Sequence, residues 1–441
     1  MTVALLAALS LAAPAGAAPL RVVQVPGFNN LTRPGVAVDR AGQGVLVFTH
    51  GEHARLTWVG AGGRITRPVQ IAAPRAPEGV GSLSAAINER GQAVVGYTLY
   101  NGDNPALGGA YGFLIRPYAT RARWGHQVPR ARLVDDRVIN ADGLSAAIGP
   151  TGVAAFAYGD SAQTAAPTSA PFGIGFEAGA ALWRPGRAPV RLVQAEPAFC
   201  LSPQVDVAGS GFVWRWMCGS LQHAGSATGL PSRLDTAAAP PNLGPNSGPL
   251  GDGDGGTTLI TAGRRVFHWA RGASVPEVSR SLGVTGEAPI TAAVSPNGTF
   301  AVLLADAKHG RLRVTIGRPG VARVTSLRLP RAVASRRPSF DDGASGLVDE
   351  SGVMAFSANG DLLVAYESHV AHKSSRLTIS GTRVARIRDR RLRVIASSDT
   401  CGPLRMAAGA GGRGLLALSC LRDAKTNRWG GAVMAIPGQA R

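Results

Sequence analysis

The sequence predicts an all-β protein: a single β-propeller of about eight, or alternatively seven, four-stranded antiparallel blades. Three observations support this fold class: a hairpin pattern that recurs along the chain, its regular spacing, and further short strands between its copies. Glycine (58) and proline (30) also interrupt the 441 residues at short intervals. Such punctuation is typical of many short strands joined by turns.

The recurring pattern is a strand, a tight polar turn and an apolar strand. It is clearest in "AVSPNGTFAVLL" (Ala293–Leu304) and "AFSANGDLLVAY" (Ala355–Tyr366). The apolar run after each turn is too short for a helix and is rich in Val, Phe and Leu. The turn contains Gly, Asn or Asp because a tight connection between two strands often needs a positive φ. We call the two strands A and B, and expect B, apolar on both faces, to lie within a stack of sheets.

Eight copies align on their turn glycines. The 370 residues from the first glycine to the last, over seven intervals, give about 53 residues for each repeat. Strand-built repeats of roughly this length indicate propeller blades. The fifth copy, "GDGDGGTTLIT", is weak and follows a low-complexity stretch, and the ring has seven blades if this copy is an insertion. The aligned glycines are Gly42, Gly91, Gly152, Gly211, Gly256, Gly298, Gly360 and Gly412.

Two more strands, C and D, fit between successive hairpins. Examples are "ARLTWVGAGGRITRPVQI" after the first hairpin and "GRLRVTIGRPGVARVTSLRL" after the sixth. Arginine alternates with aliphatic residues in the D segments, and charge on an outermost strand discourages edge-to-edge pairing. A four-stranded sheet cannot bury both faces alone, so the copies should stack around an axis.

The two ends of the chain complement each other. "PLRVVQVPG" (Pro19–Gly27) resembles a D strand without a blade, and "GGAVMAIPG" (Gly430–Gly438) resembles a C strand after which the sequence stops. We therefore predict that residues near Leu20–Val25 pair with residues near Ala432–Ile436. This pairing closes the ring and removes an open edge.

The four cysteines flank two of the predicted hairpins. Cys200 and Cys218 are symmetric about the "AGSG" turn, and Cys401 and Cys420 about "GAGG". Residues symmetric about a hairpin turn face each other, close enough for a disulfide. We predict the bonds Cys200–Cys218 and Cys401–Cys420; the alternative is four free thiols.

The first residues indicate export. "MTVALLAALSLAAPAGAAPLR" is an apolar run that ends in small residues typical of a cleavage site near Ala17 or Ala18, although no Lys or Arg precedes it. We expect residues 1–18 to be a signal peptide and 19–441 the propeller, secreted or extracytoplasmic (bacterial periplasm or cell surface). The alternatives are a short buried helix or a membrane anchor. No later segment has transmembrane length, so we expect no transmembrane segment in the mature chain.

The formal net charge is +19, carried almost entirely by arginine. The favoured interpretation is compositional bias together with edge protection. The functional interpretation is adhesion to a cell-envelope polyanion or glycan, such as a cell-wall polymer, an acidic glycan or anionic lipid, or else binding to a protein. Nucleic acid is disfavoured, because aromatic residues do not interleave with the arginines as a stacking platform requires. We expect a monomer.

The turns "SPNG" (Ser295–Gly298) and "SANG" (Ser357–Gly360), each followed by an apolar strand, resemble those of the broad class of TolB-like and WD40-like propellers. The resemblance covers the architecture of the mature chain and few motif residues. It implies a binding or docking platform, and it implies no particular site residue.

Catalytic motifs of the common hydrolase, zinc-protease and phosphate-loop types are absent from the sequence. Histidines recur instead: "HGEH" and "HVAH" each place two histidines three residues apart, directly after a B strand. In an antiparallel meander the B-to-C and D-to-A connections share one end of the ring. The predicted cluster, which draws on the first, seventh and eighth copies, is His50, Glu52, His53, Asp341, Asp342, His369, His372 and Asp399.

Imidazole and carboxylate groups together suit a divalent metal or a hydroxyl-rich ligand such as a sugar. The alternative is that these are ordinary solvated loops, and we expect no resident cofactor, with a divalent metal only weakly supported. Two functions remain. The favoured one is an exported, non-catalytic binding or scaffold protein of unknown ligand. The other is a glycan-active hydrolase or lyase with two carboxylates at the channel.

Overall fold

A computed structural model provides the structure of the protein. It describes residues 21–28, 33–71, 79–103, 113–135, 141–160, 177–191, 201–217, 221–226, 235–237, 248–261, 264–278, 282, 286–306, 308–321, 323–332, 352–369, 380–398, 401–423 and 428–438. Within these ranges the regular elements are strands and one short 3-10 turn, Ala410–Gly412. No helix in the described part of the chain is long and apolar enough to cross a membrane.

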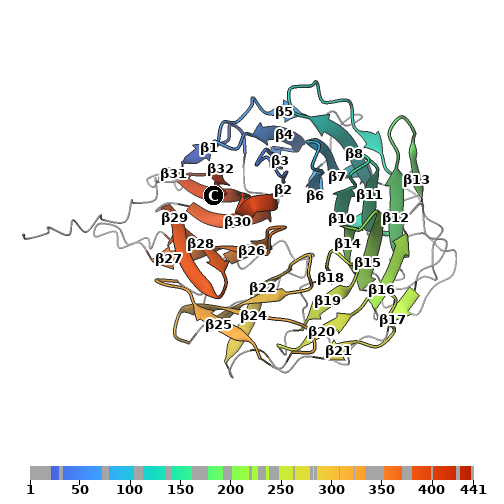
Figure 1. Ribbon diagram of the computed structural model, residues 1–441. Helices are drawn as coiled ribbons and strands as arrows, with labels where there is room; N and C mark the ends of the chain where they lie inside the picture. The colour runs from blue at the N-terminus through green and yellow to red at the C-terminus, as the bar shows by residue number, and fades with distance from the viewer. Residues whose placement is uncertain are drawn as a thin grey trace, which may run out of the picture.

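The described strands form eight four-stranded antiparallel sheets arranged in a ring (Figure 1). The predicted fold class, a β-propeller of four-stranded antiparallel blades, is confirmed. Each sheet is one blade, and in seven of them four strands that are consecutive in the chain pair in order. We number the blades in chain order: blade 1 is β2–β5, blade 2 β6–β9, blade 3 β10–β13, blade 4 β14–β17, blade 5 β18–β21, blade 6 β22–β25, blade 7 β26–β29, and blade 8 β30–β32 with β1.

The strand bounds of the first four blades show longer A, B and C strands and short D strands. They are β2 Gly35–Val38, β3 Gly44–His50, β4 His53–Val59, β5 Val69–Gln70, β6 Val80–Ile87, β7 Gln92–Asp103, β8 Phe113–Arg123, β9 Arg132–Leu133, β10 Ala141–Ile148, β11 Ala154–Asp160, β12 Glu177–Trp183, β13 Pro189–Arg191, β14 Leu201–Ala208, β15 Gly211–Met217, β16 Leu221–Ser226 and β17 Asp235–Ala237.

The weak fifth copy of the sequence repeat forms a sheet of its own, with the shortest strands. The bounds of the remaining blades are β18 Leu250–Gly251, β19 Thr257–Ile260, β20 Val266–Trp269, β21 Glu277–Val278, β22 Glu287–Val294, β23 Phe300–Asp306, β24 Arg311–Gly317, β25 Thr325–Arg328, β26 Gly352–Phe356, β27 Leu362–His369, β28 Ser380–Arg388, β29 Arg391–Ser398, β30 Cys401–Ala408, β31 Gly414–Asp423, β32 Arg428–Ile436 and β1 Val22–Gln24.

The A-to-B turns explain why the polar turn motif repeats. In blade 1 the Gln43 N–H donates to the Asp39 side chain at 2.8 Å, and Gly42 adopts a φ of +83°. In blade 6 the Thr299 N–H donates to the Ser295 hydroxyl at 2.9 Å, and Gly298 has a φ of +75°. In blades 1, 2, 5, 6 and 7 the first residue of the turn is a buried Asp, Asn or Ser whose side chain makes hydrogen bonds within the turn, whereas blades 3 and 8 have glycine at this position. Glycine follows three residues later because the left-handed conformation has no steric cost for it.

The hydrophobic core lies between neighbouring blades. B strands such as β3 and β23 are buried along almost their whole length, because each contacts the blade before it and the blade after it. One cluster joins blades 6 and 7 and includes Leu303 and Val364. Between blades 3 and 4, the indole N–H groups of Trp214 and Trp216 donate to carbonyls of β11. The sheets are thus fixed by packing and by hydrogen bonds that satisfy buried indoles.

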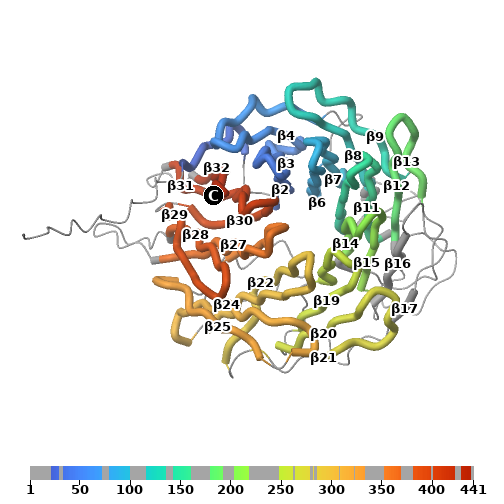
Figure 2. Tube along the Cα trace, viewed as in Figure 1, coloured from blue at the N-terminus to red at the C-terminus, as the bar shows by residue number. Residues whose placement is uncertain are grey.

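The predicted ring closure is confirmed. β1 pairs with β32 in antiparallel register, with Val23 opposite Val433. The N-terminal blue segment therefore lies beside the C-terminal red strands (Figure 2). The Val25 N–H donates to the Gly431 carbonyl, and the Gly431 N–H donates to the Phe28 carbonyl. Blade 8 is thereby built from both ends of the described chain.

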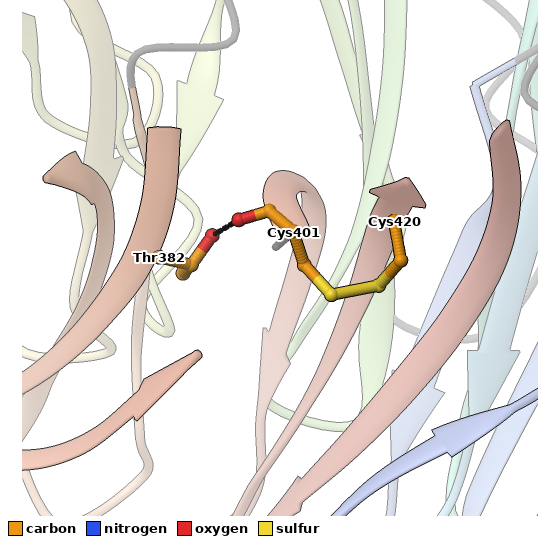
Figure 3. The surroundings of a disulfide bond; sticks show 3 residues. All are labelled: Thr382, Cys401 and Cys420. Atoms are coloured by element: carbon orange, nitrogen blue, oxygen red, sulfur yellow. Dashed lines mark hydrogen bonds between the residues drawn. A yellow bond between two sulfur atoms is a disulfide. The ribbon is translucent and has the colours of Figure 1, made fainter. Parts of the chain in front are cut away.

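The predicted disulfide Cys401–Cys420 is confirmed (Figure 3). The two residues are directly opposite in the β30–β31 ladder, with their Cα atoms 4.0 Å apart. The Thr382 hydroxyl of blade 7 donates to the Cys401 carbonyl, so this end of blade 8 is also tied to its neighbour. Cys200 and Cys218 lie outside the described residues, and their pairing stays a prediction.

The innermost A strands line the centre of the ring, and several of them contain a β-bulge. Bulges interrupt the A–B ladder in blades 2, 3, 4, 6 and 8. Near two of these bulges a serine joins adjacent blades: the Ala146 N–H donates to the Ser84 hydroxyl, and the Val205 N–H donates to the Ser145 hydroxyl. Inner-strand hydroxyls are therefore used to hold neighbouring blades together.

Candidate functional site

Three residues of the predicted histidine and carboxylate cluster are described with their side chains, and they share one tight turn. His50 ends β3, His53 begins β4, and the two are directly opposite in the ladder. Glu52 lies between them, and all three are exposed. His369 ends β27, and its side chain is not among those described. Asp341, Asp342, His372 and Asp399 lie outside the described residues, so the convergence of the full set stays a prediction.

His50 contacts the segment that closes the ring. Its Nδ1 lies 2.6 Å from the carbonyl oxygen of Gly27. A carbonyl oxygen only accepts, so the Nδ1–H of His50 donates this hydrogen bond. Metal-binding histidines are commonly oriented by such a bond from the second ring nitrogen to a carbonyl. His50 is therefore the best oriented member of the described part of the cluster.

The B-to-C connection of blade 6 holds a further exposed histidine, which is hydrogen-bonded to a carboxylate. His309 Nδ1 lies 2.6 Å from Asp306 Oδ2. Desolvation acts to raise the pKa of Asp306, but hydrogen bonds from His309 outweigh it and lower that pKa. Across the described part of the chain, no group of three or more His, Cys, Asp or Glu residues is placed to hold a metal ion.

Carboxylates at the blade ends are held in ion pairs with arginines. Asp135 accepts a hydrogen bond from the Tyr158 hydroxyl at 2.6 Å and lies 3.2 Å from the guanidinium of Arg191. Glu287 of the A strand is paired with Arg313 of the C strand in the same blade. Both carboxylates therefore have an arginine as a structural partner.

Arg215 is the most deeply buried ion-pair arginine. Its side chain is fully buried and donates to Asp206 at 2.7 Å, to the Thr257 hydroxyl at 2.7 Å and to the Gly256 carbonyl at 2.8 Å. These contacts join blade 4 to blade 5. Arg215 thus provides polar contacts beside blade 5, the blade with the shortest strands.

The inner wall carries one arginine in a different environment. Arg405 lies in the innermost strand β30, beside its bulge, and is exposed to solvent. Desolvation by the surrounding protein nevertheless lowers the pKa of its guanidinium. The inner wall therefore presents a positive charge at the position where blades 2 and 3 present serines.

Two cavities flank the closing strand and share Pro26. One, of about 440 Å³, is also lined by Gln24, Leu421 and Arg422. The other, of about 400 Å³, is lined by the C-to-D connection of blade 1 and by Arg55. The Nε atom of Arg55 is buried without a hydrogen-bond partner. Each cavity has arginine in its lining, Arg422 in the first and Arg55 and Arg67 in the second.

Exposed arginines gather in the C-to-D connections, and this feature was not recognised as a site from the sequence. Six of these connections are described, in blades 1, 2, 3, 5, 6 and 7, with residue 322 excepted. We call them the C–D rim. Asp389 is the single carboxylate among their described residues. Nine exposed arginines lie in them: Arg64, Arg67, Arg130, Arg184, Arg187, Arg271, Arg318, Arg323 and Arg390.

Comparisons with known proteins identify no family. No family model matches the chain, and no curated protein matches it. Among solved structures it is similar to a puromycin hydrolase mutant in complex with PGG, at 15% identity and a TM-score of 0.49. That match covers 92% of this chain and 62% of the hydrolase, so the chain spans less than two thirds of that protein.

Two further solved structures are similar over most of both chains. The WD40 domain of SCAP from fission yeast has 9% identity and a TM-score of 0.49, with 95% of this chain and 98% of that chain covered. A protein of unknown function from Dyadobacter fermentans has 11% identity and a TM-score of 0.42, with 86% and 99% covered. The β-propeller class rests on the strand topology of this chain itself, and the TolB-like part of the resemblance stays a prediction.

Proposed function

We propose that the protein is an exported, non-catalytic binding module that uses the propeller as a rigid scaffold to contact an anionic partner at the cell envelope. The observation that carries this proposal is the C–D rim, where nine exposed arginines are accompanied by one carboxylate. Such an imbalance raises the local potential and attracts anionic partners. Compositional bias alone gives arginine on the whole surface and does not require its presence in all six described connections.

The state of the carboxylates supports binding rather than hydrolysis. A retaining or inverting glycosidase needs two carboxylates across the scissile bond, one of them protonated. Asp135, Glu287 and Asp206 are instead each paired with an arginine. These pairs join strands or neighbouring blades, so these three carboxylates have structural partners.

Export is supported by the apolar first residues of the chain and by the disulfide Cys401–Cys420, since disulfides persist in oxidising compartments. The direct test is expression of the full chain in a bacterium, followed by N-terminal sequencing of the protein recovered outside the cytoplasm. A new N-terminus near Ala17 or Ala18 is the expected result. An intact N-terminus on protein that stays in the cytoplasm contradicts export.

The non-catalytic role is tested by incubating the purified protein with neutral and acidic polysaccharides. Reducing ends and unsaturated products are then measured over many hours. The expected result is no product above that of a heat-denatured control. A time-dependent product that requires folded protein favours the glycan hydrolase or lyase instead.

A further inference from the structure

Apolar side chains accompany the arginines of the C–D rim. In the described residues most of the large hydrophobic side chains with high exposure are valines of the D strands or of the C-to-D connections. The connections of blades 5 and 6 contain Val275, Val321 and Val324, which are 75%, 48% and 37% exposed. Arg271, Arg318 and Arg323 lie in the same two connections. Exposed valine beside exposed arginine is the composition of a surface that contacts an interface between charge and hydrocarbon.

The β28–β29 hairpin of blade 7, whose turn belongs to the C–D rim, has a high density of positive charge. Arg386 is directly opposite Arg393, and Arg388 is directly opposite Arg391. Like charges in directly opposite positions destabilise a sheet. The pKa of Arg386 is lowered chiefly by desolvation, and repulsion from Arg388 and Arg393 lowers it further. One buried carboxylate, Asp361, compensates in part at 3.5 Å from Arg388.

The turn of this hairpin adds conformational strain. Asp389 and Arg390 have φ values of +47° and +63°, in the left-handed region that favours glycine. A two-residue turn of this kind ordinarily contains Asn-Gly or Asp-Gly. Strained residues that persist in a fold point toward a role beyond folding. Here the strain places one more arginine at the outermost point of the hairpin.

We infer that the C–D rim docks the ring on an anionic lipid surface. The blades repeat around one axis, so their C-to-D connections lie at the same end of the ring. A flat surface can contact several connections at once, whereas a small anion reaches one. Each basic residue close to an anionic leaflet contributes to attraction, and short apolar side chains among them reach the headgroup region. The inference deepens the proposed binding role, and rests on it, by naming the surface and the class of partner.

A nucleic acid fits this surface less well. Binding to single strands requires aromatic side chains on which bases stack. Among the exposed large hydrophobic residues of the described chain the one aromatic is Trp429, in β32 of blade 8. The C–D rim supplies guanidinium groups and valines, which match phosphate headgroups and the edge of the acyl region.

The first experiment measures co-sedimentation of the full chain with vesicles. Vesicles of phosphatidylglycerol and phosphatidylcholine in equal parts are compared with vesicles of phosphatidylcholine alone. Binding to the anionic vesicles alone is expected, and it should weaken strongly between about 0.05 and 0.5 M NaCl as the Debye length shortens. Equal binding to both vesicles, or no binding to the anionic ones, overturns the inference. Neither result bears on the non-catalytic role, which the polysaccharide assay tests independently.

A matched pair of triple variants then locates the contact. The rim variant Arg271→Gln/Arg323→Gln/Arg390→Gln removes three charges from blades 5, 6 and 7. The control variant Arg311→Gln/Arg328→Gln/Arg331→Gln removes three exposed charges of blade 6 from outside the C–D rim. At about fivefold for each basic residue lost from an anionic surface, the rim variant should bind about 100-fold more weakly. The control should bind like the wild type. Equal losses in the two variants overturn the inference.

Two single substitutions in the hairpin turn separate charge from folding. Arg390→Gly and Asp389→Gly each place glycine at a position with a left-handed backbone conformation and so remove its steric strain. Both variants should therefore keep or raise the melting temperature. Arg390→Gly should weaken vesicle binding by about fivefold, and Asp389→Gly should strengthen it by a similar factor. Parallel changes in both variants contradict a docking role for this turn.

The valines and two competitors complete the test. The double variant Val275→Ser/Val321→Ser should weaken vesicle binding severalfold and leave the melting temperature unchanged. Soluble heparin and a DNA duplex distinguish the lipid surface from other polyanions. Rim-dependent binding to heparin or DNA, with the valine variant indistinguishable from the wild type on vesicles, overturns the lipid assignment.

Discussion

The contact between Phe28 and Gly431 at the ring closure leads to a double-mutant prediction. Phe28 follows the closing strand β1, is 2% exposed, and lies with its ring centroid 5.1 Å from that of Phe48 in blade 1. A side chain at Gly431 of β32 would overlap the Phe28 ring. The glycine therefore provides the space for an aromatic side chain that joins blade 8 to blade 1.

The magnitudes follow from this geometry. Phe28→Ala removes a buried aromatic ring and should cost about 3–5 kcal/mol. Gly431→Ala overpacks the same site and should cost about 1–3 kcal/mol. In the double variant the new methyl group occupies space that the ring has left. The double variant should therefore be less destabilised than the sum of the two single variants, by about 1–3 kcal/mol.

The assay is guanidinium denaturation of the wild type and the three variants, followed by tryptophan fluorescence and by circular dichroism. Coincident transitions and equal m-values are required before the free energies of unfolding are compared. Additive losses, within about 0.5 kcal/mol, would refute the argument that Phe28 and Gly431 form one contact across the closing blade.

Three further predictions concern stability. Replacing Cys401 and Cys420 by serine should cost about 3 kcal/mol on the loop-entropy model, and an unchanged melting temperature would contradict this. Arg215→Ala should cost about 2–3 kcal/mol because it removes several charged hydrogen bonds, whereas a loss below about 0.5 kcal/mol would show that they are replaced by water. Desolvation raises the pKa of Asp39 more than its backbone hydrogen bonds lower it, so its ionisation reduces stability as pH rises through the folded-state pKa. Asp39→Asn should therefore exceed the wild type in stability at pH 7 by a margin that shrinks toward about pH 4, and a pH-independent difference would contradict the assignment.

The fold was predictable because its local signals agree. A polar residue, a glycine three positions later and a short apolar strand recur in five of the eight blades, and blades 3 and 8 keep the glycine and the strand. The bond Cys401–Cys420 was predictable because hairpin symmetry determines which residues lie opposite each other. The closing pair of strands was predictable because Pro19–Gly27 resembles a D strand without a blade and the last blade has no D strand of its own. The two-residue turn of blade 4, at Gly209 and Ser210, shows the limit: Gly211, which was aligned as the turn glycine, is instead the first residue of strand β15.

The inner-strand bulges and the C–D rim were not predicted. A bulge depends on contacts between neighbouring blades. Ser84 and Ser145 do share a sequence signal, because both lie in the segment "LSAAI" seven residues before the turn glycine, but the repeat alone does not show that the serine contacts the next blade. The arginines were read as edge protection on D strands, which is sound for single residues. The signal that could have identified the rim is the recurrence of arginine in the connections themselves, as in "RPGR", "GRPG" and "RDRR".

Docking of the C–D rim on an anionic lipid surface is tested most directly by amide hydrogen exchange of the full chain with and without saturating phosphatidylglycerol vesicles, read by mass spectrometry. We expect protection to appear in the C-to-D connections of neighbouring blades, including residues 270–276, 318–321 and 389–390. The B-to-C turn at residues 50–53, which carries the described histidines, should exchange at the same rate in both samples. Protection of that turn without protection of the C–D rim would contradict docking through the C–D rim.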